Sequence, residues 1–224
     1  MITTARPATS DRQALRAELK IQDQDGSLIA EQDVRLWGEP AIGSRAYFRT
    51  LPKDVLADMI NDHFRRTGAT GEGSLEPDDA QALEATHHYQ VSLRRDDFLQ
   101  LPGPGAFPVS PAFPSALDIA SIVQQALAAD TEVDAVCQAV TSVEEMSIEL
   151  PKKLKILAIP PSVTIHDDFL SYRASYRLQG RTLKVRRILE DKSLGPTCPA
   201  AMAATARKFA LKVQGNLKAQ VLYR

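Results

Sequence analysis

Residues 15–36 read LRAELKIQDQDGSLIAEQDVRL, and this stretch decides the fold. From Leu15 to Ile21 apolar side chains alternate with polar ones, which is the period of a strand with one buried face. Asp25-Gly26 follows, and this dipeptide is a strong signal for a tight hairpin turn because such turns need positive φ. The alternation then resumes as far as Leu36. The stretch therefore predicts a β-hairpin.

A second hairpin is predicted nearer the other end of the chain. Alternating apolar residues run from Tyr172 to Leu178, turn at Gln179-Gly180 and return from Leu183. Residues 119–128 fit either a strand or a helix, because a short apolar run does not separate the two. The remaining predicted elements are a helix within 51–64 closed by Gly68, an exposed loop over 67–79, strands at 86–93, 146–150, 154–156, 163–165 and 219–223, and a helix over 200–213.

Proline and glycine crowd residues 102–114, and such a segment cannot form a central strand because proline has no N–H to donate. We place the boundary between two halves there. Residues 1–104 are a β-hairpin plus helix half, and residues 105–224 are a β-rich C-terminal half with a terminal helix. The halves are weakly similar, since each holds a hairpin, a loop and a proline-led helix. The predicted fold is mostly β (α+β), with antiparallel β-sandwich-like sheets and flanking helices.

Composition narrows the possible partners. The 224 residues include 27 Lys or Arg and 28 Asp or Glu, so the formal net charge is -1 and a nucleic acid is a poor first guess. No apolar run approaches the roughly 20 residues of a membrane span, and Met1 to Ala5 lacks the pattern of a signal peptide. We expect no membrane span, and any export signal would have to lie upstream.

No complete catalytic or metal-binding constellation is visible. Asp23 to Gly26 does not fit a calcium loop, and His87-His88 on a strand would point to opposite sides. No nucleophile elbow or phosphate-binding glycine loop occurs in the sequence. We expect no catalytic residue, no metal and no cofactor. Two cysteines are too few for a zinc knuckle, which leaves one disulfide or two free thiols.

Three weaker functional interpretations stay open. Cys198-Pro199 precedes a predicted helix, so a thiol enzyme using Cys198 is one alternative. A stand-alone protein that binds polysaccharide or peptide is another, and the resemblance described below would place it in the envelope; it would use the region of Trp37, Tyr47 and Phe48 or the proline-rich segment. The second half is also locally basic, and on strands we expect its charges to form a solvated outer face or to meet an anionic partner domain. The basic residues are Lys152, Lys153, Lys155, Arg173, Arg177, Arg181, Lys184, Arg186 and Arg187.

Much of the chain resembles a known group of proteins. The segment Glu145 to Arg187 contains Leu150-Pro151, Ile159-Pro160, the run YRASY at 172–176 and the run GRTLKVRR at 180–187. It resembles the β-rich C-terminal region of bacterial transglutaminase-like proteins of the Gram-negative envelope. The stretch LKIQDQDGSL at 19–28, followed by Gly38 and Arg45, is similar to the part that directly follows their papain-like core.

The resemblance implies a role and a location. In that family the Cys, His and Asp triad belongs to the core, and nothing in this sequence matches that block, so no catalytic residue is carried over. The chain would then be a non-catalytic accessory module that packs on a transglutaminase-like core domain of the same polypeptide and helps to present substrate. An exported, periplasmic setting follows from the resemblance, and with it a disulfide between Cys137 and Cys198.

Overall fold

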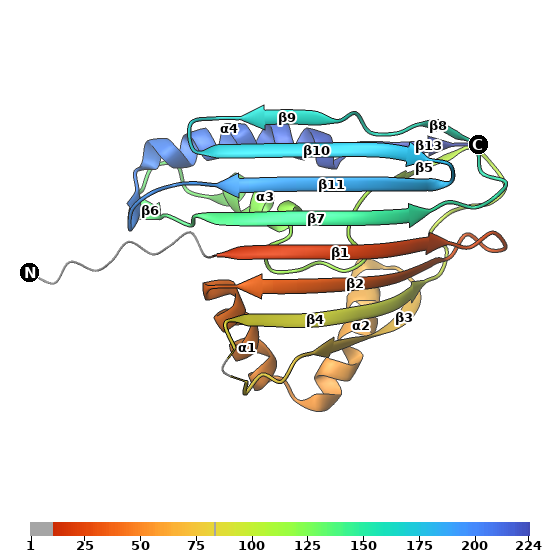
Figure 1. Ribbon diagram of the computed structural model, residues 1–224, viewed down its shortest axis with the longest axis horizontal. Helices are drawn as coiled ribbons and strands as arrows, with labels where there is room; N and C mark the ends of the chain where they lie inside the picture. Colours follow the sequence, from red (N-terminus) through yellow and green to blue (C-terminus); the bar gives the residue numbers. More distant parts are fainter. Residues whose placement is uncertain (1–10, 83) are drawn as a thin grey trace, which may run out of the picture.

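The computed structural model describes residues 11–82 and 84–224. Its centre is one mixed eight-stranded sheet in the order β3-β4-β2-β1-β7-β11-β10-β9 (Figure 1). The strands are β1 (Arg12–Ile21), β2 (Leu28–Trp37), β3 (Gly71–Pro77), β4 (Thr86–Arg95), β7 (Val140–Glu149), β9 (Val163–His166), β10 (Leu170–Gln179) and β11 (Thr182–Asp191).

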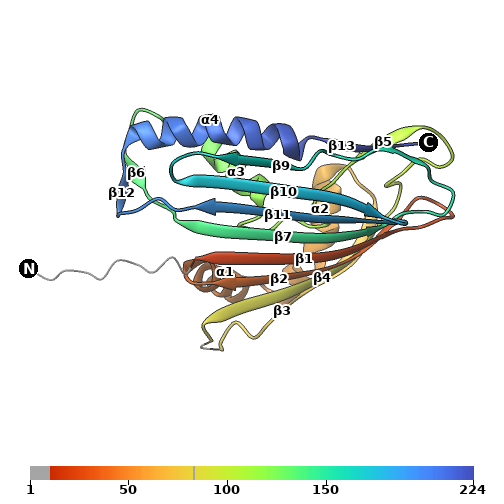
Figure 2. The same ribbon diagram turned by 45° about the horizontal axis from the view of Figure 1, so that its top comes forward.

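Four helices cover one face of this sheet (Figures 1 and 2). They are α1 (Glu39–Thr50), α2 (Lys53–Thr67), α3 (Ile119–Ala128) and α4 (Ala200–Leu217). Two small sheets complete the fold: β5 (Gly105–Pro108), β13 (Gln220–Tyr223) and β8 (Ile156–Ala158) form one, and β6 (Ala135–Val136) pairs with β12 (Thr197–Cys198) in the other. The mostly β, α+β class is confirmed, with helices as the main layer against the large sheet.

Both predicted hairpins are confirmed. β1 pairs antiparallel with β2 from Ile21 opposite Leu28 outward, and the turn contains Gly26 at φ 69°. β10 pairs with β11 around Gly180 at φ 58°. In each hairpin alternate side chains are buried toward the helices, as the period of two requires. Helices α2 and α4 and the strands β4, β7, β9 and β13 also lie where the sequence indicates.

The two halves join through β1 and β7, which pair in parallel with Arg12 opposite Thr141. The strands on one side of this pair come from residues before 105, and those on the other side come from residues after 105. One sheet and one hydrophobic core therefore span both halves.

Several elements differ from the sequence expectation or resolve it, and the short strands β5, β6 and β12 were not predicted. The predicted loop over 67–79 is wrong, because β3 forms there and pairs with β4. A Cβ at Gly73 would stand 2.9 Å from the Ile60 side chain, so glycine lets α2 lie directly against this edge strand. Residues 39–50 form α1, which we did not predict. Residues 119–128 are helical, and Asp118 caps the helix by accepting from the Ser121 N–H at 2.6 Å.

No helix within 11–82 and 84–224 combines the length and apolarity that crossing a membrane requires.

Candidate functional site

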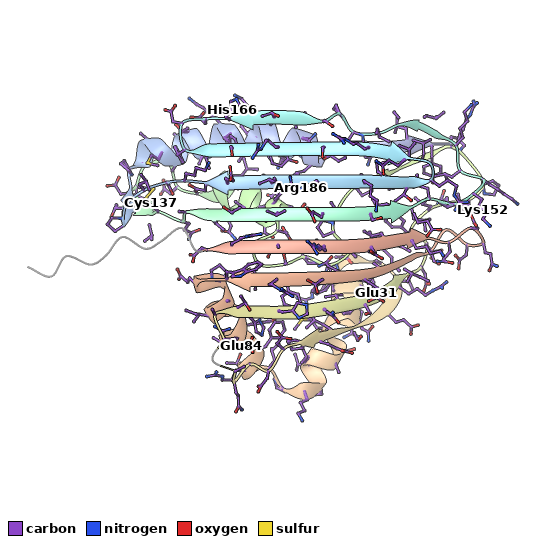
Figure 3. All side chains as sticks on the ribbon, viewed as in Figure 1. Glu31, Glu84, Cys137, Lys152, His166 and Arg186 are labelled. Carbon is purple, nitrogen blue, oxygen red and sulfur yellow. A yellow bond between two sulfur atoms is a disulfide. The ribbon has the colours of Figure 1, made fainter. Side chains whose placement is uncertain are left out.

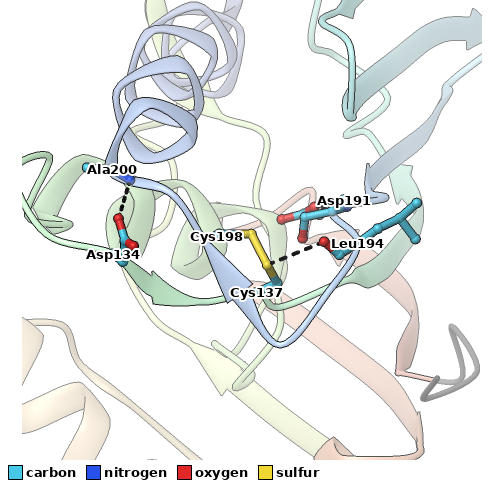
Figure 4. The surroundings of a disulfide bond; sticks show 7 residues. Asp134, Cys137, Asp191, Leu194, Cys198 and Ala200 are labelled. Atoms are coloured by element: carbon cyan, nitrogen blue, oxygen red, sulfur yellow. Dashed lines mark hydrogen bonds between the residues drawn. A yellow bond between two sulfur atoms is a disulfide. The ribbon is translucent and has the colours of Figure 1, made fainter. Parts of the chain in front are cut away.

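A disulfide links Cys137 to Cys198, 61 residues apart in the sequence, and this pairing is confirmed. It lies where the short strands β6 and β12 pair, at the end of the sheet where β1 begins (Figures 1 and 4). Next to it the Asp134 carboxylate accepts a hydrogen bond from the Ala200 N–H at 3.0 Å, which ties the loop before β6 to the start of α4. Because the sulfur of Cys198 is bonded, this form of the protein holds no thiol at that position.

The segments that the disulfide joins expose apolar side chains. Val133 is 54% exposed, Val136 is 75% exposed and Leu194 is 67% exposed. The Leu194 carbonyl lies 3.9 Å from the Cys137 sulfur (Figure 4). We call residues 130–139 and 192–199 the disulfide end. These three side chains are exposed on two segments that the disulfide holds together, and exposure to water is unfavourable for apolar groups.

We did not single out Val133, Val136 and Leu194 from the sequence. The available signal was weak: Val133 and Val136 lie in the stretch DTEVDAV at 130–136, where polar residues predominate and no strand or helix period places the valines in a core.

A buried polar cluster lies between the sheet and the helices. Arg187 and Glu144 have side chains only 2% and 1% exposed, and their charged groups are 3.4 Å apart. The Arg187 guanidinium also donates to the Val109 carbonyl at 2.7 Å and to the Tyr176 hydroxyl at 3.0 Å. Burial alone would lower the pKa of Arg187, but the Glu144 carboxylate raises it, so the guanidinium stays charged. The expectation that Arg187 belongs to the outer charged face is therefore wrong.

This cluster attaches the connecting segments to the sheet. Glu144 accepts the Ile119 N–H at 2.8 Å, at the first turn of α3. Gln32 bonds both the N–H and the carbonyl of Phe113, so the proline-rich segment is partly anchored beneath the sheet. Asn216 of α4 accepts from the hydroxyls of Tyr172 and Tyr176 at 2.8 and 2.9 Å. These bonds satisfy buried polar groups, which indicates a structural role.

The two adjacent histidines lie on opposite faces of β4, as the strand period predicts. His87 is buried beneath α1 and its Nδ1 lies 2.9 Å from the Ser44 hydroxyl. Its Nε2 is buried without a hydrogen-bond partner in the described structure, so the third group of a catalytic triad is missing there. Within 11–82 and 84–224 no group of three His, Cys, Asp or Glu side chains is arranged to hold a metal ion.

His88 lies on the other face between two carboxylates. Its Nε2 is 2.5 Å from Asp33 and its Nδ1 is 3.3 Å from Asp78. Burial lowers the pKa of His88, but the hydrogen bonds and charges of Asp33 and Asp78 outweigh it and raise the pKa above its ordinary value. His88 is therefore charged over a wider pH range in the folded protein than in the unfolded chain.

This arrangement predicts a pH-dependent effect of His88→Gln. The raised pKa of His88 adds stability that is fully present below about pH 6.5, the pKa of histidine in the unfolded chain. This stability is lost as the pH rises through the pKa that His88 has in the folded protein. We expect His88→Gln to lower the free energy of unfolding more at about pH 5.5 than at about pH 9. Urea unfolding at the two pH values measures the difference. An equal loss at both would contradict the charged state of His88.

The structure separates the three aromatic residues of the proposed binding surface. Trp37 is half-buried and points to the sheet face away from the helices, where the Arg12 guanidinium lies 4.8 Å from its ring centre. Phe48 packs on the helix face, 5.6 Å from the rings of His87 and Tyr89. Tyr47 is exposed on α1 beside Phe48. Trp37 therefore shares no groove with the other two.

Comparisons of the chain with family models, with curated proteins and with solved structures found no match.

Proposed function

We propose that the chain is a non-catalytic accessory module that packs on a transglutaminase-like or papain-like catalytic domain, with the disulfide end as the contact surface. The observation that supports this most directly is the exposure of Val133, Val136 and Leu194 on segments joined by a covalent bond. Contact with a second domain would remove these side chains from water, which is favourable for apolar groups.

The disulfide favours binding for a second reason. It links the two segments through β6 and β12, and the Asp134 to Ala200 hydrogen bond adds a further tie. A surface held in one conformation before contact loses less conformational entropy when a partner binds. The short strands of the disulfide end are therefore suited to a defined domain contact.

The half-buried disulfide also supports an oxidising location. Disulfides persist in exported proteins and are rare where thiol reductants are abundant. The Cys137–Cys198 bond and the sequence resemblance together favour the periplasm or cell envelope. In that compartment the module would position a catalytic domain of the same polypeptide and help to present substrate to it.

The proposal predicts that apolar contacts at the disulfide end carry the binding. The two partners would be this chain and the transglutaminase-like domain that the same reading frame encodes, produced as separate proteins. We expect Val136→Asp with Leu194→Asp to raise their dissociation constant more than about tenfold, because two carboxylates would be buried in an apolar contact. Isothermal titration calorimetry of the two proteins measures this dissociation constant.

Leu211→Asp is the matched control, since Leu211 is 57% exposed on α4, away from the disulfide end. It should leave binding unchanged. The proposal fails if the reading frame encodes no such domain, or if the two aspartates leave the affinity as it was. Transglutaminase or peptidase turnover by the isolated chain would also contradict a non-catalytic role.

A further inference from the structure

The sheet face that looks away from the helices carries mostly charged and polar side chains, and we call it the open face. In the described part of the chain no helix covers it (Figures 1 and 2). Glu31 on β2 and Arg186 on β11 stand on this face (Figure 3). The six long strands β1, β2, β4, β7, β10 and β11 each have ten residues, so the face is broad.

Opposite charges meet across the line between β1 and β7. The register of these two parallel strands places Glu145 on β7 beside Arg16 on β1, and Glu149 beside Lys20. In both cases the acid is on β7 and the base is on β1. At these two register positions the two strands therefore carry complementary charges.

The pattern continues one strand further out, where β11 and β2 lie at equal distances from the same line. The cross-strand row through Glu145 and Arg16 has Arg186 at its β11 position and Asp33 at its β2 position. The next row out has Lys184 on β11 and Glu31 on β2, with Ser147 and Glu18 between them. In these two rows bases on β11 thus mirror acids on β2.

Such a mirrored pattern is self-complementary. If a second copy turns by half a rotation about an axis parallel to the strands and above the line between β1 and β7, its β2 faces β11 and its β1 faces β7. Lys184 of one copy then faces Glu31 of the other, and Arg186 faces Asp33. Because of the two-fold symmetry, each of these contacts occurs twice in the dimer.

We propose that two copies of this chain associate face to face through β11, β7, β1 and β2, related by this two-fold axis. The four strands present about 650 Å² on each copy, from the usual rise per residue and strand spacing. A dimer would bury about 1,300 Å² in total, which is within the range of specific interfaces. This surface is separate from the disulfide end, so the proposal does not depend on the proposed function.

The row next to the one through Glu145 and Arg16 is the least polar part of the open face. Ile188, Val143 and Ala14 lie side by side in one cross-strand row, and none is fully exposed. Under the two-fold rotation Val143 of one copy faces Ala14 of the other. A small apolar contact therefore borders the charged rows on one side, while Ile188 of each copy faces Arg35 of the other.

The complementary pattern does not extend to the row of Ile188 and Arg35, whose outer members are Arg173 on β10 and His88 on β4. Two twisted sheets that stack face to face separate toward their edges. Arg173 of one copy and His88 of the other would therefore not come into contact. Within each copy Glu145 already lies 3.0 Å from Arg186 and 3.4 Å from Arg16. The dimer would extend exposed pairs into networks, and salt should therefore weaken it.

Charge reversal tests the arrangement. We expect the wild-type chain to sediment as a dimer at about 200 μM in about 50 mM NaCl and to dissociate in about 500 mM NaCl. Lys184→Glu alone and Glu31→Lys alone should each raise the dissociation constant more than about tenfold, because each places like charges at two symmetry-related contacts. An equimolar mixture of the two variants should form a heterodimer, and the variant with both changes in one chain should dimerise.

The matched control is Lys208→Glu with Lys212→Glu on the exposed side of α4, which should leave the dimer intact. Circular dichroism of every variant establishes that it is folded before sedimentation is compared. The proposal is overturned if the wild type is monomeric in low salt, if either single reversal dimerises as tightly as the wild type, or if the mixture fails to associate. Loss of the dimer in the α4 control would equally refute a specific open-face contact.

Discussion

Replacement of Arg187 by alanine is expected to lower the free energy of unfolding by about 3–5 kcal/mol. The Glu144 carboxylate would be left without its cationic partner in a place where its side chain is only 1% exposed. The Tyr176 hydroxyl and the Val109 carbonyl would each lose a donor as well. Removing one partner of a buried ion pair leaves the desolvation of the remaining groups poorly compensated. Guanidinium chloride unfolding followed by circular dichroism measures the change.

The neighbouring residue supplies the control. Arg186 is also ion-paired, to Glu145 at 3.0 Å, but it lies on the open face and its side chain is 55% exposed. Arg186→Ala should therefore change the free energy of unfolding by at most about 1 kcal/mol. If both substitutions had equally small effects in about 500 mM NaCl, where exposed pairs are screened, the buried pair would not have the stabilising role that its geometry indicates.

The second large effect is expected from removal of the disulfide. Cys137→Ala with Cys198→Ala should lower the free energy of unfolding by about 4 kcal/mol, since the bond closes a loop with a sequence separation of 61. The main cause is the greater conformational freedom of the unfolded chain without the cross-link. Urea unfolding of the double variant and of the oxidised wild type gives the difference.

Reduction provides an independent comparison, because the wild type treated with dithiothreitol should lose about as much stability as the double variant. Thiol titration of the denatured, non-reduced protein should find no reactive thiol. Two reactive thiols would show that the bond is not formed in solution. A loss below about 1 kcal/mol would indicate that the bond does little to restrict the unfolded chain.

Local patterns were sufficient to predict the strands and most helices. The alternation from Leu15 to Leu36 and the glycines at the two turns specify hairpins because each signal acts between residues that are close in sequence. Residues 67–79 could not be recognised as a strand from their polar composition. β3 forms because β4 offers unpaired backbone groups and because glycine admits α2 at close range.

The functional surfaces were harder to predict. The resemblance led us to expect the Cys137–Cys198 bond, but no local pattern indicates that Val133 and Leu194 would be exposed beside it. Arg187 follows the same alternation as Leu183 and Val185, yet we assigned it outward because charge usually prefers water. Its inward position depends on Glu144, 43 residues away in the sequence, and on the Val109 carbonyl.

The sequence by itself therefore determined the two hairpins, their turns and the burial of one face of each strand. Those properties depend on side-chain period and on backbone freedom at glycine, which are local. Only the tertiary structure decided that β1 pairs with β7 in parallel, which buried charge meets which, and which charges lie side by side on the open face. These outcomes depend on contacts between distant segments, because the same alternating pattern is compatible with many strand orders and only the packed core selects one.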